Sequence, residues 1–442
     1  MINMAQTETV SESTSNVLRS DAPLPHWKRN FAANFMDVMF FSLGLAFAST
    51  TTIMPVFIRQ LGGSPLIIGL VPAVVQAGQM LPPLFVAPYI ATLEHKLPFV
   101  LKMTLGERLP WPLLALTAIL LAPRYPLVML VLTIVLMAIF GLAGGICTPA
   151  WMDVVTRVTP LRIRGKLFGW SGALSGLLGA GGGLVAERVL AGFAFPYNFA
   201  FCFAATSVCM LGSFLGLAAI REPVAEERTP PGSIRAYARE LPAMLRRDRD
   251  FSLFLVVRIL SALAGMATTL VAIYATGQRG LPTSVVGLFT AVMLGTQVIT
   301  TPLFGTIADW RGYKSSLQFA LLAQAVAMLL SRFMTDTLGF SLVFALIGAA
   351  SGLVFTTTLN LVVEFAPPAD RVAYLGLHGT LIAPAVLLAP VIGGAVAEGA
   401  GYPLSFAIAA TCGFIALALL TFWVRDPRYR QLAVEGAQPP AA

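Results

Sequence analysis

The stretch LVMLVLTIVLMAIF, residues 127–140, has no charged residue and only one hydroxyl group. Polar and apolar residues do not alternate in it, as they would in a strand of a membrane barrel. It therefore predicts a helix, which satisfies its own backbone hydrogen bonds in lipid. Leu113–Ala122 and Val208–Ile220 have the same character. Since about twenty apolar residues cross a bilayer core, the fold class predicted is an all-α integral membrane protein.

Twelve such segments lie between Phe31 and Val424. They predict a cytoplasmic tail (1–30), a six-helix bundle (31–220), a linker (221–250), a second six-helix bundle (251–424) and a final tail (425–442). The first tail is rich in Ser, Thr and Glu, which predicts disorder rather than a signal peptide. The linker combines prolines with a basic stretch, which predicts an amphipathic helix on the membrane surface. The predicted spans are 31–57, 66–91, 97–122, 125–150, 166–190, 196–220, 251–277, 283–307, 314–334, 338–363, 372–397 and 402–424.

Composition and charge agree with a bilayer protein. Hydrophobic residues make up 57% of the chain and charged residues 11%, with a formal net charge of +8. Most basic residues fall in loops on one side of the predicted topology, which places both termini in the cytoplasm by the positive-inside rule. No segment could form a basic soluble domain, so nucleic acid is not an expected partner. The four cysteines fall within apolar spans, so neither disulfides nor metal sites are expected.

The two halves of the chain repeat each other. Two bundles related by parallel duplication are expected to enclose a solute cavity near the midplane of the membrane. Adding 218 to the numbers of Gly69, Leu70, Ala73, Val74 and Gln79 gives Gly287, Leu288, Ala291, Val292 and Gln297. Adding 207 to the numbers of Pro160, Arg164 and Gly169 gives Pro367, Arg371 and Gly376.

A short motif, GTIADWRGYK at residues 305–314, is predicted in the cytoplasmic loop between spans eight and nine. With it the chain resembles the major facilitator superfamily (MFS), whose loop has Gly, Asp, Gly and basic residues at these positions. Trp310 and Tyr313 depart from that pattern, and the first half lacks the Gly, Asp, Gly frame. The resemblance implies twelve transmembrane helices in two pseudo-symmetric bundles and a secondary transporter that works by rocker-switch alternating access, without a cofactor.

The loop is predicted to take part in gating. By analogy with the family, the Asp309 carboxylate would accept hydrogen bonds at the start of a neighbouring helix, near Arg164, and hold the cytoplasmic side closed. The alternative is a solvated turn with a basic tail. The shift of 207 also pairs Asp153 with Asn360 and Arg157 with Glu364, which predicts a charge cluster at the cytoplasmic ends of the fourth and tenth helices. The predicted gating residues are Gly305, Asp309, Arg311, Gly312, Lys314, Asp153, Arg157, Arg164, Asn360, Glu364 and Arg371.

Charges within spans are expensive and normally face a bundle interior or water. Asn34 and Asp37 share one face of the first helix, which the resemblance places at the cavity. Asp37 could bind a cationic group or carry a coupling proton, or it could be a hydrated carboxylate near the cytoplasmic surface. Arg258, at a similar depth in span seven, could pair with Asp37 or hold an anionic substrate. Its side chain could also snorkel to the cytoplasmic face.

Five further residues within the spans are candidates with a structural alternative. Glu107 and Arg108 lie in the third span, which the resemblance places outside the cavity, so an ion pair that locks helix packing is favoured over a proton relay. Gln79 and Gln297 could bond to each other or to substrate, with a structural role favoured. His378 could be a packing group or take part in coupling.

The leading interpretation is a monomeric, proton-coupled secondary transporter of a small solute in the cell membrane. No nucleotide-binding motif is present, and three scattered histidines do not suggest an enzyme. The alternative is a non-transporting MFS-like protein that assembles or regulates a partner, and a polar cavity between the halves would distinguish the two. The predicted direction of transport leans weakly towards export, because the spacing of the family's antiporter motif recurs in the eleventh span. The residues at that spacing are Gly376, Ala385, Ala389, Pro390, Gly393 and Gly394.

Overall fold

The computed structural model describes residues 26–223, 248–367 and 370–427. These ranges are helical and contain no strand. The first helix begins at Trp27, slightly before the predicted end of the tail at residue 30. The surface helix predicted in the linker lies outside the described residues, apart from the few at its two ends.

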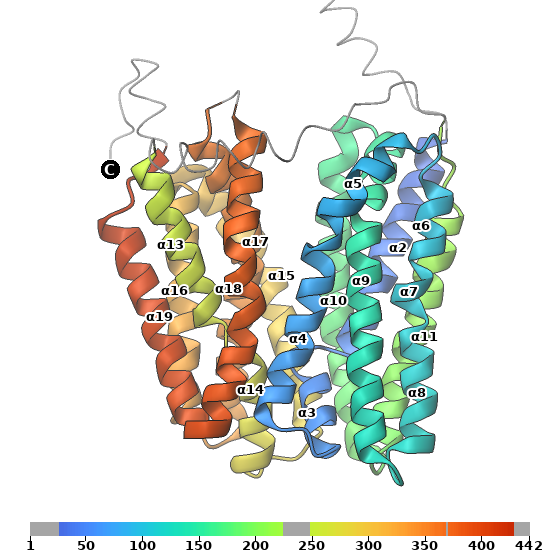
Figure 1. Cartoon of the computed structure of the whole chain (residues 1–442), viewed down its shortest axis with the longest axis vertical. Helices are drawn as coiled ribbons and strands as arrows, with labels where there is room; N and C mark the ends of the chain where they lie inside the picture. Colours follow the sequence, from blue (N-terminus) through green and yellow to red (C-terminus); the bar gives the residue numbers. More distant parts are fainter. Residues whose placement is uncertain (1–25, 224–247, 368–369, 428–442) are drawn as a thin grey trace, which may run out of the picture.

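The first half of the chain contains ten helices within its described part (Figure 1). They correspond to the six predicted spans, of which several are built from more than one helix. Their bounds are α2 Trp27–Phe47, α3 Ile53–Gln60, α4 Pro65–Met80, α5 Pro82–Thr92, α6 Leu97–Met103, α7 Leu105–Arg108, α8 Pro110–Leu121, α9 Pro126–Val158, α10 Leu161–Gly192 and α11 Tyr197–Ala218.

The second half repeats this order with fewer interruptions. Its seventh span consists of three consecutive segments, and the other five are single helices. The bounds are α13 Arg249–Ala264, α14 Thr268–Ile273, the π-helix η1 Tyr274–Gln278, α15 Val285–Arg311, α16 Tyr313–Ser331, α17 Thr337–Phe365, α18 Arg371–Ala400 and α19 Tyr402–Phe422.

Ten continuous helical segments of the described chain are long and apolar enough to cross a membrane. The second and third predicted spans complete the twelve, but neither is one helix. The second span is divided between α4 and α5 at Pro82. In the third span, α7 ends at Arg108, just before the proline that begins α8 at position 110. Proline has no N–H to donate and its ring clashes with the preceding turn, so these breaks follow from the sequence. They leave α7 as a single turn that carries Glu107 and Arg108.

Aromatic side chains fill the core of each half. In the first half, Phe57 packs against Phe199 and Phe203, with ring centroids 5.2 and 5.1 Å apart. In the second, Phe289 stacks on Phe344 with centroids 4.6 Å apart. All five rings are fully buried. Large apolar side chains on the outer helices are exposed instead, as expected of surfaces that face lipid.

The halves meet along two pairs of helices, α10 with α15 and α4 with α18. Small residues allow the close approach: a Cβ added to Gly183 would lie 2.6 Å from the amide nitrogen of Ala291. In Figure 1 the α13 start and the α19 end lie at the top, and the ribbons of the two halves diverge towards it. We call this the terminal end and the opposite one the distal end.

Among the described residues, four hydrogen bonds join the halves at the distal end. The buried hydroxyls of Thr52 and Thr290 lie 2.5 Å apart, and the Gln60 amide donates to Thr283 at 3.3 Å. Glu398 accepts from the Ser64 hydroxyl at 2.7 Å and from the Leu66 backbone N–H at 3.1 Å. The distal end is therefore where the structure holds the two halves together by polar contacts.

Candidate functional site

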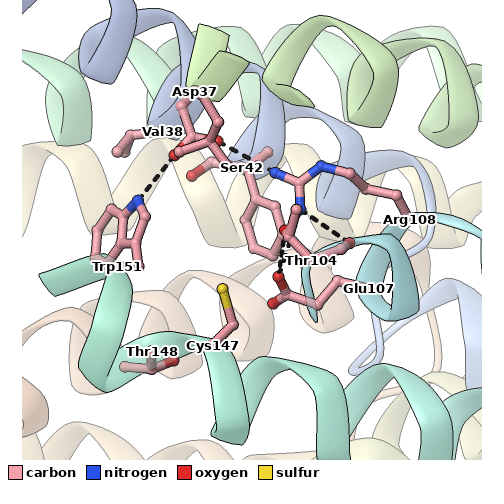
Figure 2. A pocket seen from close by; sticks show the side chains of 11 residues that line it. Asp37, Val38, Ser42, Thr104, Glu107, Arg108, Cys147, Thr148 and Trp151 are labelled. Atoms are coloured by element: carbon pink, nitrogen blue, oxygen red, sulfur yellow. Dashed lines mark hydrogen bonds and ion pairs between the residues drawn. The ribbon is translucent and has the colours of Figure 1, made fainter. Parts of the chain in front are cut away.

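A cavity of about 180 Å³ lies inside the first half, among α2, α7, α9 and the Thr104 turn before α7 (Figure 2). Its wall combines two carboxylates, one guanidinium, hydroxyls and aromatic rings. Such a mixture of apolar wall and few convergent polar groups is typical of a small-molecule site. The lining residues are Asp37, Val38, Phe41, Ser42, Thr104, Glu107, Arg108, Cys147, Thr148, Trp151 and Leu217.

Asp37 is the centre of the polar network in this cavity. The Asp37 side chain is 6% exposed, and both carboxylate oxygens have hydrogen-bond partners. Oδ1 accepts from the Ser213 hydroxyl at 2.5 Å and lies 3.3 Å from Arg108 Nη2, and Oδ2 accepts from Trp151 Nε1 at 3.0 Å. Figure 2 shows the carboxylate between the indole and the guanidinium. Three elements therefore hold one carboxylate from three directions, which fixes its position.

Glu107 and Arg108 enter the cavity because the third span is broken around them. Arg108 Nη1 lies 3.4 Å from Glu107 Oε2, which also accepts from the Thr104 hydroxyl at 2.8 Å. The guanidinium lies over the Phe41 ring at 5.8 Å from its centroid, a cation–π contact. The predicted ion pair is present. The third span lines this cavity inside the first half, whereas none of its residues lines the cavity between the halves described below, as expected.

The charges of this network do not balance. When both carboxylates are ionised, Asp37 and Glu107 carry two negative charges against the single positive charge of Arg108. A buried site of this kind favours the uptake of one more positive charge, either a proton or a cationic group. The network therefore has the charge to hold one further proton or cationic group.

A second cavity, of about 290 Å³, lies between the two halves. Gln76 and Gln79 line it from α4, and Thr290, Met293 and Leu294 line it from α15. Hydroxyls of residues 49–51 add to the polar wall. Ser42 borders both cavities, so the charged network of the first half adjoins the space between the halves.

The predicted pair between Asp37 and Arg258 is wrong. Asp37 is paired with Arg108 within its own half, whereas Arg258 Nη1 donates to the Ser261 hydroxyl at 2.9 Å in the other half. The third span is broken around Arg108, and this break brings the Arg108 guanidinium close to α2. Helical periodicity alone would not place it there. His378 lies near Arg258, with its ring stacked on Phe254.

The remaining polar candidates within the spans do not lie together at one site. Asn34 is fully buried but donates to the carbonyl of Asn30 and does not line the charged cavity. Gln79 lines the cavity between the halves. Gln297 packs at Gly352 of α17, where an added Cβ would lie 2.8 Å from its Cγ. No hydrogen bond joins Gln79 to Gln297 in the described part of the chain.

The predicted gating residues of the first half bond within that half. Asp153 accepts from Lys96 at 2.5 Å and from Arg157 at 2.8 Å. Arg164 donates to the carbonyls of Thr156 and Thr159, so it caps the end of α9. Asn360 and Glu364 lie in the last two turns of α17, and Arg371 begins α18.

The loop motif of the second half has a clear local role. Gly312 follows the last residue of α15, Arg311, and has a φ of +90°, which a glycine adopts without strain. Lys314 Nζ donates to the carbonyls of Thr421 and Val424 at 3.4 and 2.8 Å and so caps α19. Gly305 and Asp309 lie in α15, but the Asp309 side chain is outside the described residues, so the latch stays a prediction.

Sequence reasoning missed the hydrogen-bond donors around Asp37. Ser213 and Trp151 hold the carboxylate, and Thr104 holds Glu107. A weak signal was available, because a tryptophan within an apolar span needs a partner for its N–H. Nothing in the spacing, however, says that α9 and α11 present these groups to the same residue of α2.

Comparison with known proteins places the chain in a family. The family model described as "Major Facilitator Superfamily" matches residues 38–382 and 254–441. A tetracycline resistance protein, class H, of Pasteurella multocida is 27% identical over 153 residues, 35% of this chain and 38% of the relative. The multidrug resistance protein MdtG of Salmonella arizonae is 30% identical over 148 residues, 33% and 34% of the two chains. The matches span about a third of the length of these curated relatives.

Solved structures share the fold over nearly the whole chain. The nucleoside transporter NupG superposes with a TM-score of 0.66 at 13% identity, covering 89% of this chain and all of the other. A D-xylose-proton symporter gives a TM-score of 0.62 at 16% identity and covers 91% and 97%. The repeat, the twelve spans and the family model agree, and the chain belongs to the major facilitator superfamily, a family of multi-pass membrane transporters and not of enzymes.

Proposed function

We propose that this protein exports a small amphipathic molecule in exchange for protons, by alternating access, with Asp37 as the group that binds the proton. The observation that carries the proposal is the buried network of Asp37, Glu107 and Arg108, which holds two carboxylates against one guanidinium. The relatives whose names refer to tetracycline and multidrug resistance support export of drug-like molecules.

The cavity between the halves favours transport over the alternative of a non-transporting assembly protein. Its wall contains the hydroxyls of Ser42, Ser49 and Thr290 and the amides of Gln76 and Gln79. A protein that only scaffolds a partner would have no need for a cavity with a polar wall in an apolar interface, because burial of each polar group carries a desolvation cost. Because both walls come from one chain, a monomer suffices as the transporting unit.

We place the termini in the cytoplasm of a cell whose plasma membrane holds the protein, from the distribution of its basic residues. The distal end, held by four hydrogen bonds between the halves, then faces outward. In this orientation the described state is closed towards the outside. The cargo would then enter from the opposite, cytoplasmic side, where none of these four hydrogen bonds lies.

The proposed coupling arises because a proton and a cationic cargo compete for the same excess negative charge in the first cavity. A cationic cargo near the first cavity is attracted while Asp37 and Glu107 are both ionised, and the aromatic rings of Phe41 and Trp151 offer it an apolar and cation–π surface. A proton that arrives from outside neutralises the excess negative charge and weakens that attraction. Binding of the proton therefore releases the cargo, and loss of the proton to the cytoplasm prepares the site again.

The test uses Asp37→Asn, which keeps the shape of the side chain and removes its charge. In proteoliposomes with an imposed pH gradient, the natural protein is expected to transport ethidium or tetracycline, and the variant is expected to lose gradient-driven transport. Asp336→Asn is the matched control. Asp336 is exposed at the distal end and accepts from the Gly339 N–H as an N-cap, a role that Asn fills as well.

The comparison is interpretable only if Asp37→Asn folds, which size-exclusion chromatography and thermal unfolding verify. Gradient-driven transport by folded Asp37→Asn at the rate of the natural protein would remove Asp37 from the coupling role. Absence of gradient-driven transport in the natural protein and in Asp336→Asn, with both probes, would count against proton-coupled export of this class of molecule.

A further inference from the structure

Arg258 is a buried cation that has no anionic partner among the residues the structure describes. Its side chain is 8% exposed, and Nη1 donates to the Ser261 hydroxyl at 2.9 Å, while Nε has no hydrogen-bond partner. No carboxylate of the described chain forms an ion pair with it. The low exposure also rules out the alternative that this guanidinium snorkels into water.

Arg108, the buried arginine of the first half, shows how this protein compensates a buried guanidinium. It is buried to a similar degree, at 7% exposed, but it contacts two carboxylates, a hydroxyl and a backbone carbonyl. A buried charge is normally retained only when such partners compensate the loss of hydration. Arg258 has one neutral partner, so the structure alone does not explain why a charge is kept there.

A second polar side chain without a hydrogen-bond partner in the described part of the chain lies near Arg258. His378, on α18, stacks its ring against Phe254, which is one turn before Arg258 on α13, with centroids 6.2 Å apart. Its Nε2 atom is buried and has no hydrogen-bond partner, and His378 interacts electrostatically with Arg258. Two nitrogen-bearing side chains with unused hydrogen-bonding capacity therefore meet between α13 and α18.

We propose that Arg258, Ser261 and His378 bind the anionic group of the cargo, a carboxylate, in the second half. A carboxylate supplies the charge that Arg258 lacks and accepts hydrogen bonds from the planar guanidinium, the hydroxyl and the imidazole. The proposal rests on the proposed transport function and specifies it. Since the cavity of the first half has an excess of negative charge, an amphoteric molecule would satisfy both halves.

The test uses benzoate and benzamide, which have nearly the same shape and differ in charge. Thermal unfolding of the purified protein is followed at constant ionic strength with increasing concentrations of either probe. Benzoate is expected to raise Tm in a concentration-dependent way, because a ligand that binds only the folded state stabilises it, and benzamide is expected to have little effect. In Arg258→Gln the response to benzoate should disappear.

Two further variants separate binding from folding. Arg332→Gln, which changes an exposed arginine at the distal end, should keep the benzoate response. Arg258→Lys keeps the charge but loses the planar pair of donors, so its response should need about tenfold more benzoate. Without any probe, Arg258→Gln should unfold at the same or a higher temperature than the natural protein, because it removes an uncompensated buried charge.

The assignment is overturned if benzoate and benzamide act alike on the natural protein, or if Arg258→Gln keeps the benzoate response. It is also overturned if Arg258→Gln alone lowers Tm markedly, because that result assigns Arg258 a structural role. None of these measurements needs a proton gradient. Their failure is therefore distinct from a failure of proton-coupled transport at Asp37.

Discussion

Replacing Arg108 by Gln tests whether the charged network of the first half is organised as the structure shows it. The guanidinium lies 3.3 Å from Asp37 Oδ1 and 3.4 Å from Glu107 Oε2, and it donates to the Ser213 hydroxyl at 2.7 Å. It is the cation that these buried carboxylates share. Arg108→Gln leaves two carboxylates in a largely apolar interior without a counter-charge.

The magnitude follows from the cost of breaking a buried ion pair. Removal of one partner typically destabilises a protein by about 3–5 kcal/mol, because the other charge stays buried and uncompensated. For a folding unit the size of the first bundle, each kcal/mol corresponds to about 2–4 °C in Tm. We therefore expect Arg108→Gln to lower Tm by roughly 6–20 °C.

The double variant Asp37→Asn/Arg108→Gln provides the decisive comparison. It removes one charge of each sign, so it should be more stable than the sum of the two single effects predicts, by at least about 1 kcal/mol. Thermal unfolding in detergent, followed by intrinsic fluorescence, measures all three variants, with Arg332→Gln as the control for loss of an exposed arginine. A small Tm change in Arg108→Gln, similar to that of the control, or strictly additive effects in the double variant, would refute the network.

Two more predictions concern the gate and the helix packing. Glu398→Ala removes the acceptor of two hydrogen bonds between the halves at the distal end. These bonds are worth about 1–2 kcal/mol in total in this exposed setting, so opening of the distal end should increase about 5–30-fold. In a Thr50→Cys background, whose cysteine lies in the cavity between the halves, the rate of reaction with an impermeant maleimide should then rise, and an unchanged rate would count against a closing role of the Glu398 hydrogen bonds. Gly78→Ala should lower stability by about 1–3 kcal/mol, because the new Cβ would lie 2.5 Å from the carbonyl carbon of Gly141. Gly172→Ala, whose Cβ meets open space in α10, should be neutral or slightly stabilising, and equal unfolding temperatures for the two variants would contradict the close approach.

The sequence predicted the membrane spans and their number well because the signal is local. A run such as residues 127–140 has to be a helix in lipid whatever surrounds it, since no other backbone arrangement satisfies its hydrogen bonds there. The prolines at 82 and 110 mark breaks in the second and third spans for the same kind of reason, a missing N–H within the segment itself. The repeat at fixed shifts added the division into two halves.

The partners within the site were less predictable. Because Asp37 and Arg258 have a similar depth in their predicted spans, the sequence suggested that they could pair across the two halves. The structure instead pairs Asp37 with Arg108 and surrounds it with Ser213 and Trp151. These three residues are 71, 176 and 114 positions away along the chain. Helical periodicity says which residues share a face of one helix, but it does not say how that face is rotated towards its neighbours.

The amino-acid sequence by itself thus determined the free-energy cost of placing each group in a membrane. Apolar runs must form helices, and the few charged residues among them need compensating partners. Only the tertiary structure decided how they are compensated, because helix packing sets distances across segments remote in sequence. It gave Asp37 three partners at 2.5–3.3 Å and left Arg258 with a single hydroxyl. Electrostatic and hydrogen-bond energies in a low-dielectric interior depend on such distances.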